Sequence, residues 1–294
     1  MVLIVNLNTT IDTTYLINDF KKDKIFRPEK TIKTGGGKGV NVARVLNYLK
    51  IKNKVIGFAG GFNKNFILSS LKNEKINFIP VQIKGDSRVC TIILDLKNST
   101  ETVINENGPV ITQNEVNKFL SAFKKELKNA EILAISGSMP KGVPFNLYAD
   151  LINIAKKNKI PVILDTSKEP LFESIKAKPN ILKVNKNEIK YIYKKNYSLK
   201  NILKDLNNKG IAIPIITIGE KGSLYLNEEK KVIRYPAETI NKISTIGSGD
   251  AFTAGIIYGI LNKKNITESI KAATHLAALN AMKIGAGCLP KIKK

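Results

Sequence analysis

The sequence predicts an α/β protein in which a mainly parallel central sheet is flanked by helices and carries a small additional β-sheet. Short apolar runs alternate along the chain with segments whose apolar residues recur at helical spacing, a pattern typical of parallel strands joined by crossover helices. Two regions, residues 13–34 and 76–105, contain strand patterns without helical ones. Because no repeat, low-complexity linker or Pro/Gly-rich boundary divides the chain, we expect a single domain over residues 1–294.

The strands of the central sheet are expected at apolar runs bounded by polar residues. The first is Val2–Val5, a continuous apolar run of the kind that is buried on both faces of a sheet. Between the runs, helical spacing predicts helices such as 42–49 and 116–127, the second preceded by Thr112 and Glu115 as a capping-box pair. The further strands are expected at residues 55–59, 132–135, 162–164, 181–184 and 213–218.

The two regions without helical spacing are expected to form a small sheet inserted into the larger core. Runs such as Thr91–Leu94 and Thr102–Ile104 are joined by polar turns, which predicts antiparallel strands. A small inserted sheet commonly serves as a lid or a dimer surface. We therefore expect a lid formed mainly by residues 9–34 and 76–106.

The chain is strongly basic, with 48 Lys and Arg against 24 Asp and Glu, a formal net charge of +24. This charge alone would suit nucleic acid or an anionic membrane as a partner. The lysines are spread along the whole chain, however, and the only arginines are Arg27, Arg44, Arg88 and Arg234. We interpret most of the charge as a solvated surface, with anionic small molecules as substrates, and keep a basic nucleic-acid-binding protein as an alternative.

The residues indicate a reducing, cytoplasmic location. Cys90 and Cys288 cannot make a disulfide framework, and they have no metal-type spacing with the single His275. No run of about 18 apolar residues is present that could span a membrane. The apolar start of the chain reaches polar residues within a few positions, unlike a signal peptide. We expect no membrane partner.

The strongest local signal is residues 247–250 (GSGD), which open an apolar helix at 251–261. Glycines before a helix let backbone N–H groups converge on an anion, and the helix dipole favours negative charge there. A carboxylate such as Asp250 beside a bound anion suits the removal of a proton from a hydroxyl that attacks a phosphoryl group. The same residues also fit a glycine turn in which Asp250 only complements the helix dipole.

A second glycine cluster, residues 35–39 (GGGKG), also enters a helix and is followed by Asn41. It is not a P-loop, because Lys38 is followed by glycine, and it does not match the G-x-G-x-x-G dinucleotide fingerprint. Its flexible backbone, cation and amide suit sugar hydroxyls and a phosphate. Gly-rich turns of this kind also occur in α/β proteins without any ligand.

Residues 183–188 (KVNKNE) end one strand and begin a helix. Asn185 and Glu188 stand where they could hold a hydrated Mg²⁺ beside phosphates. The same two residues fit a variant of the capping box.

A further strand end, residues 217–223, would place backbone and hydroxyl groups near a nucleotide, through Thr217, Gly219 and Gly222. Asn280, in a helix expected at 267–284, would lie near the adenine. An ordinary turn and an exposed amide are the alternatives.

Taken in order, five phrases resemble the ribokinase-like sugar kinases, and within them the 1-phosphofructokinase and tagatose-6-phosphate kinase branch of the PfkB family. The resemblance covers residues 1–287, and the ordered set is far more specific than any single motif. The phrases are residues 7–12 (LNTTID), 36–44 (GGKGVNVAR), 136–140 (SGSMP), 185–188 (NKNE) and 247–250 (GSGD).

The resemblance implies a ribokinase-like fold, a β-sheet lid often used in dimerisation, and hence a homodimer through the lid. It implies Mg²⁺ and ATP on the donor side and a phosphorylated ketohexose as the acceptor. The catalytic group would be Asp250, with Gly247, Ser248 and Gly249 as an anion hole. The implied nucleotide and Mg²⁺ contacts include Lys183, Asn185 and Glu188, and the implied sugar contacts are Asp12, Gly37, Lys38 and Asn41, with Arg88 reaching the sugar phosphate from the lid.

The substrate within this branch is indicated by two segments. Residues 86–91 (DSRVCT) look like the tagatose-6-phosphate kinases, whereas residues 165–170 (DTSKEP) are similar to the fructose-1-phosphate enzymes. We expect tagatose 6-phosphate, slightly favoured, with fructose 1-phosphate as the alternative. A nucleoside or pentose kinase would not need cations for a substrate phosphate, and Lys38 and Arg88 argue against it.

Overall fold

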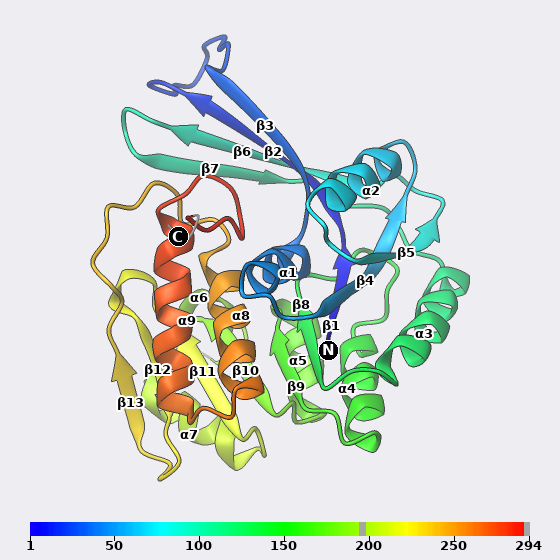
Figure 1. Cartoon of the computed structure of the whole chain (residues 1–294), viewed down its shortest axis with the longest axis vertical. Helices are drawn as coiled ribbons and strands as arrows, with labels where there is room; N and C mark the ends of the chain where they lie inside the picture. Colours follow the sequence, from blue (N-terminus) through cyan, green and yellow to red (C-terminus); the bar gives the residue numbers. More distant parts are fainter. Residues whose placement is uncertain (194–197, 291–294) are drawn as a thin grey trace.

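The computed structural model describes residues 1–193 and 198–290, so residues 194–197 and 291–294 of the expected single domain lie outside the described residues. Within this part of the chain the strands form a nine-stranded sheet, in the order β13-β12-β11-β10-β9-β8-β1-β4-β5, and a separate four-stranded sheet (Figure 1). The larger sheet is parallel from β5 to β11, as predicted, and β12 and β13 extend it in antiparallel pairing. Its strands are β1 Val2–Asn8, β4 Asn53–Gly60, β5 Phe78–Ile83, β8 Ile132–Ser136, β9 Val162–Asp165, β10 Ile181–Asn185, β11 Ile213–Thr217, β12 Ser223–Leu226 and β13 Val232–Tyr235.

Helices cover both faces of the large sheet and give the molecule two apolar cores. One core includes residues of α1 Lys38–Tyr48, α2 Asn63–Asn73, α8 Ser248–Leu261 and α9 Ile266–Ala281. The other includes residues of α3 Gln113–Leu127, α4 Leu147–Lys157, α5 Lys168–Lys176, α6 Lys186–Ile189 and α7 Leu199–Asn208. A short 3₁₀ helix, η1 Gly219–Lys221, joins β11 to β12.

Strand β1 lies inside the sheet, between β8 and β4, and its continuous apolar run serves both cores. Leu3 and Val5 pack into one core, whereas Val2 and Ile4 pack into the other. This arrangement confirms the prediction of a strand buried on both faces. Since successive side chains of a strand point to opposite faces, only an apolar run without alternation can satisfy both.

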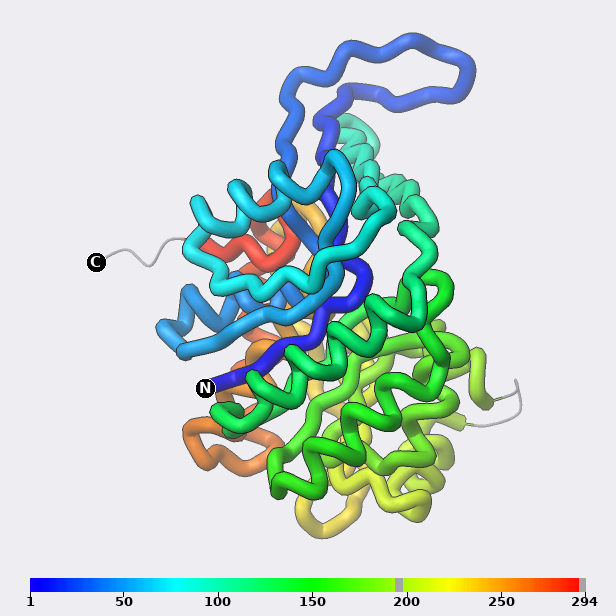
Figure 2. The backbone as a smooth tube through the Cα atoms, turned by 90° about the vertical axis from the view of Figure 1, so that its right-hand side faces the viewer, coloured from blue at the N-terminus to red at the C-terminus, as the bar shows by residue number. Residues whose placement is uncertain are grey.

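The smaller sheet contains β2 Thr10–Ile17, β3 Lys30–Gly36, β6 Arg88–Asp95 and β7 Thr100–Asn105, in the order β3-β2-β6-β7. We call it the lid sheet. Figure 2 shows the blue hairpin of β2 and β3 projecting at one end of the molecule. Pairing is antiparallel at β2–β3 and β6–β7, as predicted, but β2 and β6 are parallel, because the chain passes through the main domain between them.

The start of the lid at residue 76 is wrong. Residues 78–83 form β5, which pairs in parallel with β4 at the edge of the large sheet. Val81 and Ile83 are buried in the core that also contains residues of α3 to α7. The lid strand β6 begins only at Arg88. The alternating pattern of β5 resembles that of a lid strand, because an edge strand and a lid strand both expose one face.

The predicted capping box at the start of α3 is present. The Thr112 hydroxyl accepts a hydrogen bond from the Glu115 N–H at 3.3 Å, and the Glu115 carboxylate accepts one from the Thr112 N–H at 2.7 Å. None of the helices in residues 1–193 and 198–290 is long and apolar enough to cross a lipid bilayer.

Helices α8 and α9 pack side by side (Figure 1), and a glycine allows their close approach. A Cβ atom at Gly255 would lie 2.3 Å from the Cα atom of Ala273. This contact sets the position of α8, whose first turn carries Asp250.

We expect Gly255→Ala to lower the free energy of unfolding by about 1–3 kcal/mol, because α9 must move away from the added methyl group. The same change in an unobstructed helix would stabilise the protein by about 0.5–1 kcal/mol. Urea denaturation of both proteins measures the difference. An unchanged or higher stability of the variant would show that the helix pair does not require glycine.

Candidate active site

A cavity of about 1470 Å³ lies between the lid sheet and the carboxyl ends of the parallel strands. Ligand sites of open α/β sheets lie at this end of the strands. With one exception, the residues predicted for the site line this cavity. They are Asp12, Gly37, Lys38, Asn41, Arg88, Lys183, Asn185, Glu188, Thr217, Gly219, Gly222, Gly247, Ser248, Gly249 and Asp250.

The exception is Asn280, which does not reach the position expected for an adenine contact. Its side chain is fully buried in α9, and its amide nitrogen donates to the Ile246 carbonyl at 2.8 Å. Its amide oxygen accepts from the Gly287 N–H at 2.8 Å. The helical repeat turns Asn280 towards α8, whereas Ala277 and Ala281 of the same helix line the cavity. Asn280 therefore supports the glycine loop from behind.

The first turn of α8 provides free backbone donors. Gly247 precedes the helix in the left-handed conformation, with φ of 83°, and the Ser248 N–H donates to the Thr245 carbonyl. Among the described residues, the N–H groups of Gly247 and Gly249 have no acceptor. These two groups, rather than all three that were predicted, are available to an anion at the positive end of the helix dipole.

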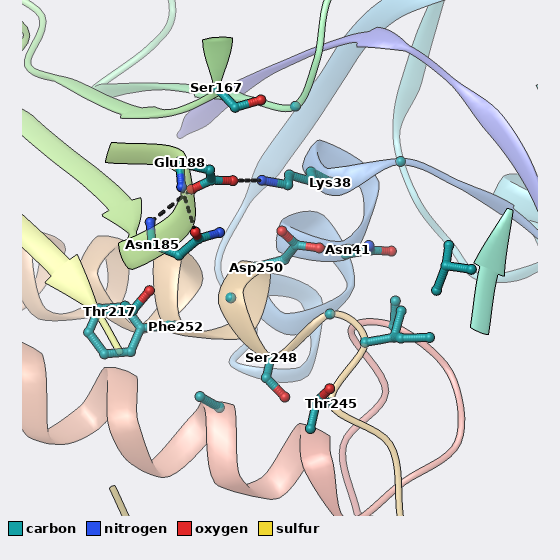
Figure 3. A pocket seen from close by; sticks show the side chains of 18 of the residues that line it. Lys38, Asn41, Ser167, Asn185, Glu188, Thr217, Thr245, Ser248, Asp250 and Phe252 are labelled. Carbon is teal, nitrogen blue, oxygen red and sulfur yellow. Dashed lines mark hydrogen bonds and ion pairs between the residues drawn. The ribbon is translucent and has the colours of Figure 1, made fainter. Parts of the chain in front are cut away.

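Asp250 is a buried carboxylate beside these donors, with only 5% of its surface exposed. Burial raises the pKa of Asp250 to about 6, since a charge is poorly solvated there, while the nearby Lys38 ammonium opposes this rise. The Asn41 amide nitrogen donates to Asp250 Oδ2 at 2.8 Å, and Figure 3 shows the two side chains pointing toward one another. A carboxylate with this pKa is ionised near neutral pH and can accept a proton.

Asp165, at the end of β9, holds two lysines together and was not predicted for the site. Its carboxylate is fully buried and lies 2.6 Å from Lys183 Nζ and 3.2 Å from Lys38 Nζ. The Thr253 hydroxyl of α8 donates to the same carboxylate at 3.0 Å. Burial alone would raise the pKa of Asp165, but Lys183 and Lys38 outweigh it and lower the pKa to about 2. In the sequence, Asp165 directly follows a buried apolar run and opens residues 165–170 (DTSKEP), but neither feature predicts its contacts with the two lysines.

The ammonium of Lys38 lies between two carboxylates. Its Nζ is 3.2 Å from Asp165 Oδ1 and 3.2 Å from Glu188 Oε1 (Figure 3). Burial opposes the charge of Lys38, but the surrounding carboxylates raise its pKa. The structure thus places Lys38 beside Glu188 and Asp250, at the junction of the two glycine-rich helix starts.

Asn185 and Glu188 form the capping box that was the structural alternative for this segment. Asn185 Oδ1 accepts hydrogen bonds from the N–H groups of Asn187 and Glu188, and Glu188 Oε2 accepts one from the Asn185 N–H. Both side chains also line the cavity. Residues 1–193 and 198–290 contain no cluster of three or more His, Cys, Asp or Glu suited to hold a metal ion.

Arg88 and Asp12 are charged residues at the end of the cavity that the lid sheet covers. Arg88, at the start of β6, donates to Asn105 Oδ1 at 2.9 Å and to the Asn8 carbonyl at 3.4 Å. Burial raises the pKa of Asp12, while the Arg44 and Arg88 guanidinium groups oppose this rise. Asn8 Oδ1 is buried and, among the described residues, has no hydrogen-bond partner. These polar groups lie where the lid sheet meets the main domain.

The end of the cavity away from Arg88 is lined in part by glycine and alanine. Thr217, Gly219 and Gly222 lie at the turn after β11, and Gly219 has open space where a Cβ atom would stand. Ala277 and Ala281 of α9 line the facing wall. These small residues leave room for a planar group such as the aromatic base of a nucleotide.

The lid sheet is seated on the loop that leads to Gly247. The Glu101 carboxylate of β7 accepts hydrogen bonds from the N–H and the hydroxyl of Thr245, both at 2.7 Å. The underside of the lid adds an apolar contact, in which Cys90, Ile92 and Leu94 pack against Ile246 and Ile284. The lid sheet therefore covers one end of the cavity and contacts the loop that leads to Gly247.

The chain is similar to known carbohydrate kinases in sequence and in fold. The chain is 32% identical over 292 residues to a tagatose-6-phosphate kinase of Staphylococcus epidermidis, covering 96% of this chain and 92% of that protein. The crystal structure of a possible 1-phosphofructokinase from Thermotoga maritima superposes with a TM-score of 0.91 at 26% identity, covering 99% of this chain and 94% of that chain.

A ribokinase from Thermotoga maritima, 18% identical, shares the fold with a TM-score of 0.77 over 98% of this chain and 94% of that chain. The predicted ribokinase-like fold is therefore confirmed. The family described as pfkB family carbohydrate kinase matches residues 4–292. The chain belongs to the PfkB family of carbohydrate kinases.

Proposed function

We propose that this kinase transfers the γ-phosphoryl group of ATP to a hydroxyl of a phosphorylated ketohexose. Tagatose 6-phosphate is slightly favoured over fructose 1-phosphate as the acceptor. The observation that carries the proposal is the position of Asp250, a buried carboxylate beside two free N–H groups of a helix start. The tagatose-6-phosphate kinase at 32% identity and the possible 1-phosphofructokinase at 26% identity support the acceptor class.

In the proposed reaction, Asp250 takes the proton from the acceptor hydroxyl as the hydroxyl oxygen attacks the γ-phosphorus, and the bond from that phosphorus to the β–γ bridging oxygen breaks, so that ADP leaves. The N–H groups of Gly247 and Gly249 stabilise the charge that develops on the transferred group. Lys38, held beside Asp250 by two carboxylates, is better placed for the transferred phosphoryl group than for the acceptor phosphate. This assignment differs from the role that the resemblance implies for Lys38, which is a contact with the sugar phosphate acceptor.

The donor set at Asn185 and Glu188 fits Mg²⁺. An amide oxygen and a carboxylate on the cavity wall are hard oxygen ligands, and Mg²⁺ in phosphate sites keeps several waters and takes few protein ligands. Bound there, Mg²⁺ would neutralise charge on the ATP phosphates. Glu188 also orients Lys38, and Asn185 holds Glu188 through the capping box.

The proposal includes a homodimer formed through the outer face of the lid sheet. Tyr15 of β2 stands opposite Ile93 of β6, and Ile104 of β7 stands opposite Thr91, so these side chains share the face away from the cavity. Ile104 is 56% exposed. A partly exposed apolar face on a sheet of this kind is suited to a second copy.

We expect Asp250→Asn to lower kcat by about two to four powers of ten, the usual contribution of a positioned general base. The amide keeps the shape of the side chain and removes the proton acceptor, so the affinity for ATP should change little. ADP release over a range of substrate concentrations measures both effects. Asp150→Asn, on the exposed side of α4, serves as the control and should be fully active. If the Asp250→Asn enzyme retains most of the original kcat, Asp250 is not the base.

We expect Glu188→Gln and Asn185→Ala to raise the Mg²⁺ concentration needed for the half-maximal rate, because each removes an oxygen ligand or its support. Asn265 and Glu268 form an equivalent capping box at the start of α9 and provide matched controls. Asn265→Ala and Glu268→Gln should leave the Mg²⁺ requirement unchanged. Equal behaviour of both pairs would mean that Asn185 and Glu188 act only as a helix cap.

We expect Arg88→Ala to lower kcat/KM for a ketohexose phosphate by about ten- to a hundredfold, since a charge-assisted hydrogen bond contributes about 1.5–3 kcal/mol. Arg27→Ala, at an exposed arginine between β2 and β3, is the control. The assay compares fructose 1-phosphate, tagatose 6-phosphate, fructose 6-phosphate, ribose and adenosine. The assignment is wrong if ribose or adenosine is the best acceptor, or if Arg88→Ala leaves kcat/KM unchanged for every phosphosugar. The enzyme is then a pentose or nucleoside kinase.

A further inference from the structure

Arg44 is a buried arginine in α1 that none of the predicted roles uses. Only 8% of its side chain is exposed, and its five N–H donors make five hydrogen bonds. Two of these go to the Glu74 carboxylate at the end of α2. The others go to the side chain of Asn41 and to the carbonyl groups of Gly35 and Ala286.

The contact with Asn41 determines how the Asn41 amide is oriented. Arg44 Nη1 donates to Asn41 Oδ1 at 2.8 Å, and Asn41 Nδ2 donates to Asp250 Oδ2, also at 2.8 Å. A guanidinium group has no acceptor, so it can face only the oxygen of an amide. The nitrogen of Asn41 must then face Asp250. Reversal of the amide would put N–H against guanidinium on one side and oxygen against carboxylate on the other.

A ring of contacts holds the guanidinium plane in place. The Ser70 hydroxyl donates to Glu74 Oε1 at 3.2 Å, and the Gly35 N–H donates to the Ser70 hydroxyl at 2.9 Å. Since Arg44 contacts both Glu74 and the Gly35 carbonyl, the ring closes on Arg44. Lysine has no planar fork and could not make these contacts together.

We propose that Arg44 is a positioning residue for the phosphoryl transfer: it fixes the Asn41 amide so that Asn41 always donates a hydrogen bond to Asp250. The inference rests on the proposed role of Asp250 as the base. It also adds to the predicted role of Asn41, because one N–H of its amide donates to Asp250 while its oxygen accepts from Arg44. The second N–H of the amide is left for the predicted sugar contact.

The hydrogen bond from Asn41 favours the ionised form of Asp250 and lowers its pKa, against the rise caused by burial. The other charged groups that face Asp250 are Lys38 of α1, Asp165 of β9 and Lys183 of β10. Changes at Asn41 or Arg44 leave these three groups in place. Loss of the Asn41 donor should therefore raise the pKa of Asp250, so that the base is protonated, and the rate falls, at a higher pH.

The test is the acid limb of the pH profile of kcat, measured for Asn41→Leu, Arg44→Lys and the double variant. We expect Asn41→Leu to move the limb upward by about one pH unit or more, as expected for loss of a hydrogen bond to a charged group. Arg44→Lys should move it in the same direction by less, and the double variant should match Asn41→Leu alone. Arg27→Lys, at an exposed arginine between β2 and β3, should leave the acid limb at the same pH.

An Arg44→Lys shift of equal size with and without Asn41, or no shift in any variant, would overturn the inference. Should Arg44→Lys fail to fold, Asn41→Asp decides the question, because it keeps the acceptor for Arg44 and replaces the donor toward Asp250 with a second carboxylate. We expect a larger upward shift in that variant, and an unmoved limb would overturn the inference. A fully active Asp250→Asn enzyme would instead refute the proposed base itself.

Discussion

The buried carboxylate of Asp165 is the group on which the rest of the site depends. It receives Lys38 from α1, Lys183 from β10 and the Thr253 hydroxyl from α8. A buried charge is tolerated only when its partners are in place, and removal of one partner leaves an uncompensated ion. These contacts therefore fix the two glycine-rich helix starts, at Lys38 and at Ser248, relative to each other. The position of Asp250 and the free N–H groups beside it follow from that arrangement.

Much of the fold could be predicted from the sequence, because the signals were local. The apolar run Val2–Val5 matches the packing of β1 into two cores, and the Thr112–Glu115 pair forms the expected cap. Strand β5 could not be assigned in this way. Its alternating residues fit an edge of either sheet, and the choice depends on which neighbour offers an unpaired edge, which only the assembled molecule determines.

The location of the site was predictable and its internal pairing was not. Glycine-rich strand ends mark the edge of a parallel sheet where ligands bind, and the predicted residues there do line the cavity. Which polar group faces which depends on the angles at which helices leave the sheet. Lys38 and Asp165 come from different strand-to-helix connections, and nothing near either residue predicts their contact. Asn280 likewise needed the position of α8 to be recognised as a support of the loop.

The hydrogen bonds of Glu101 with Thr245 couple the lid sheet, which covers one end of the cavity, to the loop before Gly247. A ligand that draws the lid sheet onto the main domain also orders the loop before Gly247, where the donor phosphates would bind. Linkage is reciprocal, so the factor by which one ligand improves the affinity for the other is the same in either direction. In the proposed reaction, a sugar phosphate that draws the lid sheet down would improve the affinity for ATP, and ATP would improve the affinity for the sugar phosphate by the same factor.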